Sequence, residues 1–300
     1  MVHFPDILPG IRRRVYPMPT VPADATPSLP VVATFAPLGG ESLRMRLDPR
    51  HYSQRSILAC LQCGELYEAE TSLLLKRVLR PGDGVLDIGA HVGWFTLFSA
   101  LLVGSRGTVM AFEPHPGNFS HLQENILLNG FAHVHPFNLA LADRPGEAEM
   151  FENLDNDGGH ALWDVGDHDF NRRSRATPTR FSVELSTLDK VMAANGFMPL
   201  RLVKMDVEGA ESAIVRGGLE TPVRCGYPLL VMEINRFALG RMGSSEEELR
   251  ANLAGLGYRP WIILPDGRLR ALEEGAYLDP GHVFNLAFAC PDRMEGEWIG

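Results

Sequence analysis

Short apolar runs alternate with stretches of helical periodicity through most of the chain. Each run has the length of a buried strand and is bounded by turn-forming or polar residues. Five such runs lie at 85–88, 108–112, 134–141, 202–205 and 229–232. Helical periodicity is found near 93–103, 116–129, 186–196, 209–217 and 246–256. This alternation predicts the α/β class, with a doubly wound, mostly parallel sheet that helices cover on both faces.

The regions outside this alternation predict how the chain is divided. Residues 1–50 are rich in proline and predict an extended N-terminal arm. Residues 51–300 form the predicted domain, which opens with helical periodicity over 53–80. Runs near 258–264 and 283–290 have no helix of comparable length between them, so we expect an antiparallel edge strand pair there.

One long internal segment has neither strand nor helix periodicity. A hairpin is expected near 147–152, and residues 151–182 are polar, glycine-containing and irregular. Long loops in compact domains often act as lids or binding loops. We therefore expect residues 151–182 to cover or bind the substrate.

The first strand is followed by a turn with a distinctive acid and two glycines. In doubly wound sheets, ligands bind beyond the carboxyl ends of the strands. Gly89 and Gly93 form a G-x-x-x-G turn, whereas a dinucleotide site would read G-x-G-x-x-G. Asp87 precedes the first glycine, and its carboxylate would repel a phosphate but attract a cation. S-adenosylmethionine, which carries an ammonium and a sulfonium group, suits this turn.

Two polar residues at the ends of the next strands extend the predicted site. Glu113 follows the second strand and can accept hydrogen bonds from both ribose hydroxyls, although acids in NAD enzymes do the same. Asn138 lies where the adenine edge would be met. Because these residues end successive strands, together they predict an S-adenosylmethionine site. A nicotinamide-dependent oxidoreductase is the alternative, but its glycine motif is absent from this turn.

Four segments carry a pattern that is characteristic of one family. They are Tyr67-Glu68 before Pro81-Gly82-Asp83, the run from Leu86 to Gly93, Ala111-Phe112-Glu113-Pro114, and the run Lys204-Met205-Asp206-Val207-Glu208-Gly209-Ala210-Glu211. Over roughly residues 65–260, the chain resembles the FkbM-type family of S-adenosylmethionine-dependent methyltransferases. The resemblance implies a Rossmann-like methyltransferase sheet. It also implies an O-methyltransferase that acts on a hydroxyl of a small molecule, such as a sugar, a polyketide or another secondary metabolite.

The strand ends and the resemblance together predict the residues that contact the cofactor. They are Tyr67, Glu68, Asp87, Gly89, Ala90, His91, Gly93, Thr96, Glu113, Pro114, Asn138 and Asp206. His91 is a departure, because the family more often has asparagine at this position. We base no mechanism on it.

The acceptor hydroxyl must lose a proton, which calls for a general base or a metal ion that acidifies it. Asp206 ends the fourth strand beside the expected methyl group, and Glu208 and His160 are the other catalytic candidates. Asp206, Glu233 and Asn235 offer the oxygen ligands that suit Mg²⁺. Both mechanisms stay open at this stage, one with a metal and one with Asp206 or His160 as the base.

The composition and charge of the chain argue against some classes of partner. The 300 residues carry a net charge of −9, which argues against nucleic acid as the substrate. No apolar run approaches the ~18–20 residues of a membrane helix, and the start has no secretory signal pattern. Cys60 and Cys63 form a pair without a second pair at zinc-site spacing, so the four cysteines are expected to be reduced.

We therefore expect a cytoplasmic enzyme with a small-molecule hydroxyl substrate and no membrane or nucleic-acid partner. Its N-terminal arm would support a homodimer. A non-catalytic subunit that binds S-adenosylmethionine is the main alternative.

Overall fold

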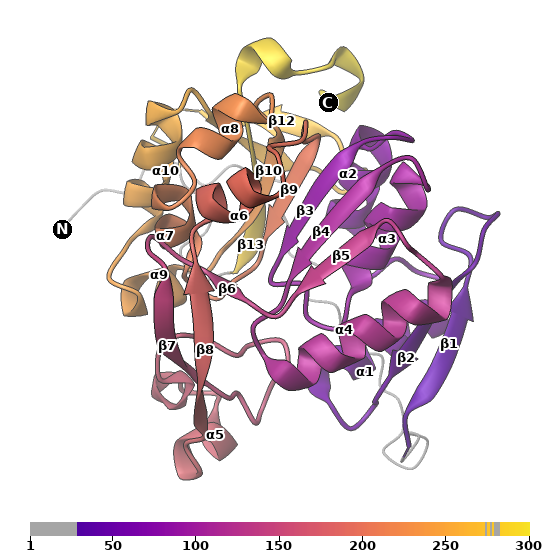
Figure 1. Ribbon diagram of the computed structural model, residues 1–300, viewed down its shortest axis with the longest axis vertical. Coiled ribbons are helices and arrows are strands. Elements are labelled where there is room, and N and C mark those ends of the chain that lie inside the picture. Colours follow the sequence, from indigo (N-terminus) through magenta and orange to yellow (C-terminus); the bar gives the residue numbers. More distant parts are fainter. Residues whose placement is uncertain (1–28, 274, 277, 279–282) are drawn as a thin grey trace.

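A sheet of eight strands runs through the centre of the molecule (Figure 1). The computed structural model describes residues 29–273, 275–276, 278 and 283–300. The strand order is β12-β11-β13-β10-β9-β3-β4-β5, in which β10, β9, β3, β4 and β5 are parallel. The predicted α/β class with a doubly wound, mostly parallel sheet is confirmed.

The elements follow the chain with these bounds. The strands are β1 Val31–Phe35, β2 Leu43–Leu47, β3 Gly84–Ile88, β4 Thr108–Phe112, β5 Val134–Phe137, β6 Ala140–Leu141, β7 Gly146–Phe151, β8 Arg180–Ser186, β9 Leu202–Met205, β10 Leu229–Ile234, β11 Arg259–Ile263, β12 Leu269–Ala271 and β13 Phe284–Ala289. The α-helices are α1 Tyr52–Gln62, α2 Ala69–Val78, α3 Trp94–Val103, α4 Pro116–Asn129, α5 Arg172–Ala176, α6 Leu188–Ala194, α7 Glu211–Arg216, α8 Glu220–Arg224, α9 Arg236–Arg241 and α10 Glu246–Gly255. Short 3₁₀ turns lie at Val165–Asp167, Pro291–Arg293 and Gly296–Trp298.

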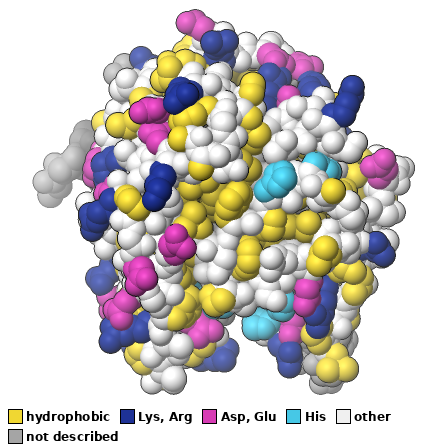
Figure 2. Space-filling view, viewed as in Figure 1, with side chains coloured by type: hydrophobic (Ala, Val, Ile, Leu, Met, Phe, Trp, Pro, Cys, Tyr) yellow, Lys and Arg dark blue, Asp and Glu magenta, His cyan; other side chains and the backbone are white. Residues whose placement is uncertain are grey.

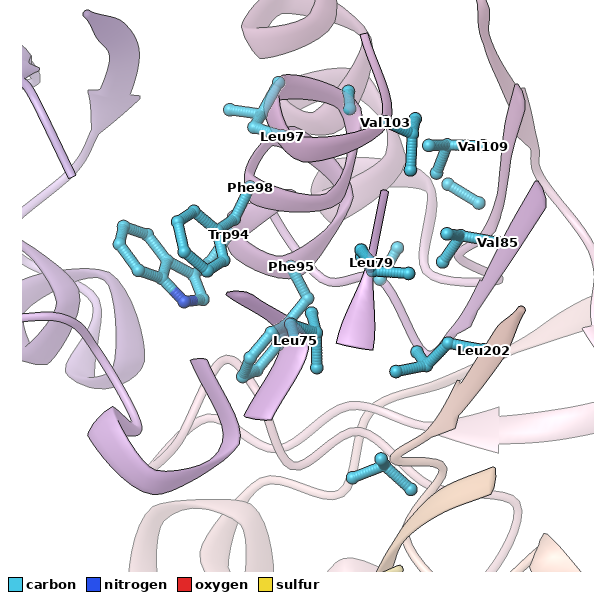
Figure 3. Close-up of a cluster of buried hydrophobic side chains, with 14 of the residues drawn as sticks. Leu75, Leu79, Val85, Trp94, Phe95, Leu97, Phe98, Val103, Val109 and Leu202 are labelled. Atoms are coloured by element: carbon cyan, nitrogen blue, oxygen red, sulfur yellow. The ribbon is translucent and has the colours of Figure 1, made fainter. Parts of the chain in front are cut away.

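Alternate residues of the central strands point to opposite faces and build two hydrophobic clusters. Val85 and Leu202 belong to the cluster that packs with α2, α3 and α4. Figure 3 shows these two side chains beside those of Leu75, Phe95 and Val103. Leu86 and Val203 belong to the cluster that packs with α6, α7 and α10. This period of two is that of a strand buried on both faces, which explains why β3 reads as a continuous apolar run. Burial of each leucine or valine side chain stabilises the folded protein by about 1.5–3 kcal/mol.

The described part of the predicted arm packs on the domain. β1 and β2 form an antiparallel hairpin, and the inward side chains Leu43, Met45 and Leu47 are fully buried. Asn125 of α4 accepts a hydrogen bond from the backbone N–H of Arg46 at 2.7 Å. The inward side chains of β2 therefore join the core, and residues 1–28 of the predicted arm lie outside the described residues.

Two segments differ from the sequence prediction. The predicted strand 134–141 is divided, since β6 leaves the main sheet and pairs with β8 in a separate three-stranded sheet. β7 covers the predicted hairpin region, but its partner is β8, which lies almost 30 residues later. The antiparallel pair β11–β13 is confirmed, although β12 lies outside it at the sheet edge.

Candidate active site

The order of the strands reverses between β3 and β9, and the carboxyl ends of these strands touch. The backbone N–H of Asp206 donates to the carbonyl of Ile88 at 2.9 Å. Gly89 has φ +82°, and a Cβ added there would lie 1.8 Å from the carbonyl oxygen of Asp206. Only glycine fits at this position. The turn after β3 therefore lies in direct contact with the residue that follows β9.

A pocket lies at this edge, between the carboxyl ends of the strands and the loop after β7. Its lining includes Gly89, His91, Glu113, Pro114, Asn118, Leu139, Ala140, Leu141, Gly158, His160, Ala161, Leu162, Asp206, Val207 and Glu208. Figure 2 shows this side of the molecule with hydrophobic side chains gathered over its middle. Of the predicted site residues, the pocket thus brings together seven: Gly89, His91, Glu113, Pro114, His160, Asp206 and Glu208.

Glu113 is held at the floor of this pocket by two backbone amides. Its carboxylate accepts hydrogen bonds from the N–H of His91 at 2.8 Å and of His115 at 2.9 Å. The side chain is 5% exposed, and this burial raises the pKa of Glu113 to about 7. The two amides fix the carboxylate while each of its oxygens keeps a further lone pair for a ligand hydroxyl.

Asp87 has one oxygen without a partner among the described residues. Thr96 donates its hydroxyl to the other oxygen at 2.6 Å. Asp87 is 1% exposed, and burial raises its pKa against the opposing effect of Lys204. A buried, unpaired carboxylate oxygen is costly unless a ligand donor completes it. The ammonium group of S-adenosylmethionine is a donor of the required charge.

A buried lysine holds Asp206. Lys204 Nζ lies 3.0 Å from Asp206 Oδ2 and 4.5 Å from the ring centre of Phe95. Burial alone would lower the pKa of Lys204, but the carboxylates of Asp206, Glu68 and Asp87 outweigh it and raise the pKa above its usual value. Lys204 is therefore a permanent cation beside the pocket.

Several carboxyl groups near Asp206 hold their protons more strongly than usual. Burial, followed by repulsion from Asp206, raises the pKa of Glu208 to about 8 and that of Glu233 well above its ordinary value. Burial also raises the pKa of Glu68 to about 7, although Lys204 opposes the shift. Glu208 lines the pocket, so a carboxyl group with a pKa of about 8 borders this space.

Three residues around the site have left-handed backbone conformations that are uncommon for residues other than glycine. They are Glu68 with φ +42°, His91 with φ +52° and Glu208 with φ +51°. Such strain persists where the surrounding structure imposes it, and it concentrates at functional sites. The strained backbone directs the carboxylate of Glu68 to the side chain of Asn285 at 2.9 Å and that of Glu208 to Asn235 at 3.2 Å.

A loop residue that the sequence analysis did not single out organises the pocket rim. Asp157 Oδ2 lies 2.9 Å from His91 Nε2, and Asp157 Oδ1 accepts the backbone N–H of Ser53 at 2.7 Å. Asn118 donates to the carbonyl of Asp157 at 2.9 Å. Asp157 thus joins the loop after β7 to α1, to α4 and to the turn after β3. No short motif marks it, because its partners lie 39 to 104 residues away.

His160 lines the pocket as predicted, but its basic nitrogen is already used. Its Nδ1 accepts the backbone N–H of Asn153 at 2.9 Å, and its ring stacks on His115 at 3.9 Å. Burial, followed by the neighbouring His115, lowers the pKa of His160 to about 3. The role of His160 as a base stays a prediction that this geometry does not favour.

The other predicted cofactor residues are not among those that line the pocket: Tyr67, Glu68, Asp87, Ala90, Gly93, Thr96 and Asn138. Gly93 caps α3, and Ala90 is buried in the turn. Tyr67 packs edge-on against Trp94. Asn138 donates its amide N–H groups to the carbonyls of Glu113 and Pro114, and its contact with adenine stays a prediction.

Two of the three predicted metal ligands have other partners. Asn235 Oδ1 caps α9 by accepting the N–H of Ala238 at 3.1 Å, and Asp206 pairs with Lys204. Glu233 has one unpartnered oxygen among the described residues. Within the described ranges, no group of three or more histidine, cysteine or acidic residues is arranged to hold a metal ion. The set Asp206, Glu233 and Asn235 stays a prediction.

Comparisons with known proteins show which family the chain resembles. A family model described as "Methyltransferase FkbM domain" matches residues 87–260. The 2-O-methyltransferase NoeI of Sinorhizobium fredii is 30% identical over 149 residues, which cover 47% of this chain and 60% of that protein. The 31-O-demethyl-FK506 methyltransferase FkbM of Streptomyces tacrolimicus is 30% identical over 171 residues, with 46% and 60% covered. The chain thus matches less than two thirds of the length of either relative.

Among solved structures, the methyltransferase FkbM from Methylobacillus flagellatus KT is similar with 13% identity and a TM-score of 0.41. The match covers 79% of this chain and 54% of that chain. In the part of the chain that the structure describes, no helix is long and apolar enough to cross a membrane.

Proposed function

The chain belongs to the FkbM methyltransferase family, and we propose that it transfers the methyl group of S-adenosylmethionine to a hydroxyl of a small molecule. The observation that carries this proposal is the pair of buried carboxylates at the ends of adjacent parallel strands, Asp87 on β3 and Glu113 after β4. Since these strands are neighbours in the sheet, a ligand that lies along their carboxyl ends would bring a cation to Asp87 and a ribose diol to Glu113.

Each of these acids would meet a different part of the cofactor. Glu113 would accept the ribose hydroxyls with the lone pairs that the two backbone amides leave free. The unpaired oxygen of Asp87 would accept the ammonium group. Leu139 and Leu141 offer an apolar wall for the adenine ring. These residues fit the group, and its bound form supplies an electrophilic methyl carbon.

The chain's own residues would orient the acceptor and take its proton. With S-adenosylmethionine bound, the acceptor oxygen would displace the sulfur at the methyl carbon, so that the products would be a methyl ether and S-adenosylhomocysteine. We assign the hydroxyl proton to the ionised form of Glu208, whose raised pKa of about 8 makes this carboxylate a stronger base than an exposed glutamate. The ionised fraction grows as the pH rises towards 8, so turnover should rise with it. Asp206, fixed by Lys204, would position the hydroxyl for in-line attack.

The names of the two relatives support oxygen as the methyl-accepting atom, since one is a 2-O-methyltransferase and the other a 31-O-demethyl-FK506 methyltransferase. The net charge of −9 favours a small acceptor over nucleic acid. A Mg²⁺ requirement has no support from the donor set described above.

Two measurements test the proposal. Calorimetry should give saturable binding of S-adenosylhomocysteine, and labelled S-adenosylmethionine should transfer its methyl group to a hydroxyl in a panel of secondary metabolites. Binding of NADH without binding of S-adenosylhomocysteine would contradict the cofactor assignment. Cofactor binding without transfer to any acceptor would support the non-catalytic subunit instead.

A further inference from the structure

Two histidine rings stack on each other beside the pocket, and each has a fixed tautomer. The ring centres of His115 and His160 are 3.9 Å apart, with 16° between the ring planes. His115 Nδ1 accepts the backbone N–H of Asn118 at 3.2 Å, and His160 Nδ1 accepts that of Asn153 at 2.9 Å. A backbone N–H can only donate, so Nδ1 is unprotonated in both rings. A neutral ring of this kind carries its hydrogen on Nε2.

Both rings are neutral near neutral pH. Burial is the main cause that lowers the pKa of His115 to about 4 and that of His160 to about 3. The neighbouring His115 lowers the pKa of His160 further, because two stacked imidazolium ions would repel each other. At its Nε2, His160 is therefore an uncharged hydrogen-bond donor.

The Nε2–H of His160 is open to a ligand. His115 Nε2 lies 3.8 Å from a carboxylate oxygen of Glu152. His160 Nε2 has no hydrogen-bond partner within the described residues, and it is not enclosed there as a buried unpaired atom. Because His160 lines the pocket, this N–H is accessible from it. A fixed donor in an otherwise apolar pocket orients a ligand and gives specificity.

His160 belongs to the side of the pocket that contains Glu113. His115, on which it stacks, donates its backbone N–H to the Glu113 carboxylate at 2.9 Å. After burial, the groups that most affect the pKa of His160 are His115, His91 and Asp157, and no acid at the end of β9 is among the main causes. Glu113 is the proposed ribose ligand, so the donor would meet the adenosine half of the cofactor rather than the methyl acceptor.

The side chains near this donor suit a flat, uncharged ring. Leu162, two residues after His160, packs with Ala140 and Met150, and all three line the pocket together with Leu139. The ring nitrogens of adenine accept hydrogen bonds and carry no hydrogen. An uncharged N–H donor can therefore pair with one of them without placing a charge against the base.

We propose that His160 donates its Nε2–H to a ring nitrogen of the adenine base, so that it recognises the cofactor and does not take a proton. This inference rests on the proposed function, because it requires S-adenosylmethionine as the ligand. The stacked ring of His115 and the backbone N–H of Asn153 fix the orientation of the donor. The loop after β7 would thus take part in cofactor recognition.

Modified cofactors test this contact in the unmodified chain. Calorimetry would compare S-adenosylhomocysteine with its 1-deaza, 3-deaza and 7-deaza analogues, each of which replaces one ring nitrogen of adenine by C–H. We expect one of the three analogues to bind about five- to tenfold more weakly than S-adenosylhomocysteine, as for the loss of one uncharged hydrogen bond.

This loss of affinity should disappear in His160→Asn. The Oδ1 of asparagine can take the place of the histidine Nδ1 and accept the N–H of Asn153, but the side chain is too short to replace Nε2–H. His160→Gln, whose amide nitrogen can reach the position of Nε2, should restore part of the loss and serves as the second variant. His135→Asn, which changes an exposed histidine of β5 outside the pocket lining, is the matched control and should behave as the parent does.

Three results would overturn the adenine contact. The first is that no deaza analogue binds the parent more weakly than S-adenosylhomocysteine. The second is that each analogue loses the same affinity in the parent and in both His160 variants. The third is that the loss for 2′-deoxy or 3′-deoxy S-adenosylhomocysteine, and for no deaza analogue, disappears in His160→Asn, which would assign the donor to the ribose. A parent chain that binds no S-adenosylhomocysteine would refute the proposed function together with this contact, whereas the three results above refute the contact alone.

Discussion

His91 and Asp157 are joined side chain to side chain at 2.9 Å, although 66 residues separate them. His91 also donates its backbone N–H to Glu113, so the loop after β7 is connected through one residue to the proposed ribose ligand. The pKa of Asp157 is held well below its usual range, because its hydrogen bond and charge interaction with His91 outweigh the effect of burial. The loop and the cofactor turn therefore form one structural unit.

Asp157→Asn should weaken this unit. The amide keeps the size of the side chain but loses the charge that binds His91, so the turn that supports Glu113 becomes less fixed. We expect the affinity for S-adenosylhomocysteine to fall about five- to tenfold, in line with ~1–1.5 kcal/mol for a partly compensated charged hydrogen bond. Calorimetry measures this change in the affinity for S-adenosylhomocysteine. Asp155→Asn, in the same loop but bonded to Ser174 and Arg173, is the control and should bind normally.

Glu113→Ala should remove the ribose contact itself. Loss of a charged hydrogen-bond acceptor costs about 1.5–3 kcal/mol, which corresponds to a ten- to hundredfold weaker affinity for S-adenosylhomocysteine. Glu149→Ala, an exposed acid on β7, is the matched control. Unchanged affinity in the Glu113 variant would place the cofactor elsewhere.

The central part of this site could be predicted from the sequence because it depends on local patterns. A buried parallel strand followed by an acid and a glycine turn is readable at Asp87 and Gly89, and the sheet brings Asp206 to the same edge. Asp157, Asn118 and Asn285 could not be predicted, since each acts through a partner distant in the chain.

The division of the predicted strand 134–141 also depends on residues that are distant in the chain, so the sequence pattern does not predict it. Its apolar residues run from Val134 to Leu141 with only His135 and Asn138 as polar interruptions. Asn138 turns its amide to the backbone of Glu113 and Pro114, and the chain leaves the main sheet there. β6 then pairs with β8, more than 40 residues later in the chain. The periodicity of a strand predicts which faces are buried but not which strand is its partner.

Glu208→Gln tests the raised pKa of Glu208 through the pH dependence of protein stability. Burial raises the pKa of Glu208 from 4.5 to about 8, so the folded protein binds a proton there that the unfolded chain has released. The folded carboxyl is neutral below about pH 8, and stability falls as pH rises from the unfolded pKa to the folded one. The amide does not ionise, so the variant should lose less stability than the parent between pH 5 and pH 8, by thermal unfolding. A parallel pH dependence in both proteins would contradict the shift.

The same variant should lose turnover. If Glu208 takes the acceptor proton, its amide has no base to offer, and turnover should fall ~10²-fold or more, as is usual for general acid–base groups. Affinity for S-adenosylhomocysteine should change little, because the carboxylate faces the acceptor. His160→Asn should lose less turnover, since its Nδ1 is occupied by the N–H of Asn153. The reverse order of the two variants would move the base to His160.

Asp206→Asn decides between the remaining mechanisms when it is combined with chelation. The amide leaves Lys204 as a buried cation with a weaker partner, and the acceptor hydroxyl loses the carboxylate that aligns it, so turnover should fall ~10²-fold with little change in cofactor affinity. Asn235 Oδ1 caps α9 and Asp206 Oδ2 holds Lys204, so two of the three predicted Mg²⁺ ligands are engaged elsewhere. We therefore expect the parent enzyme to keep its activity in EDTA. Loss of activity in EDTA with recovery on adding Mg²⁺ would instead require these two side chains to exchange their partners for the metal. Near-normal turnover of Asp206→Asn would exclude both the metal-ligand role and the positioning role for this carboxylate.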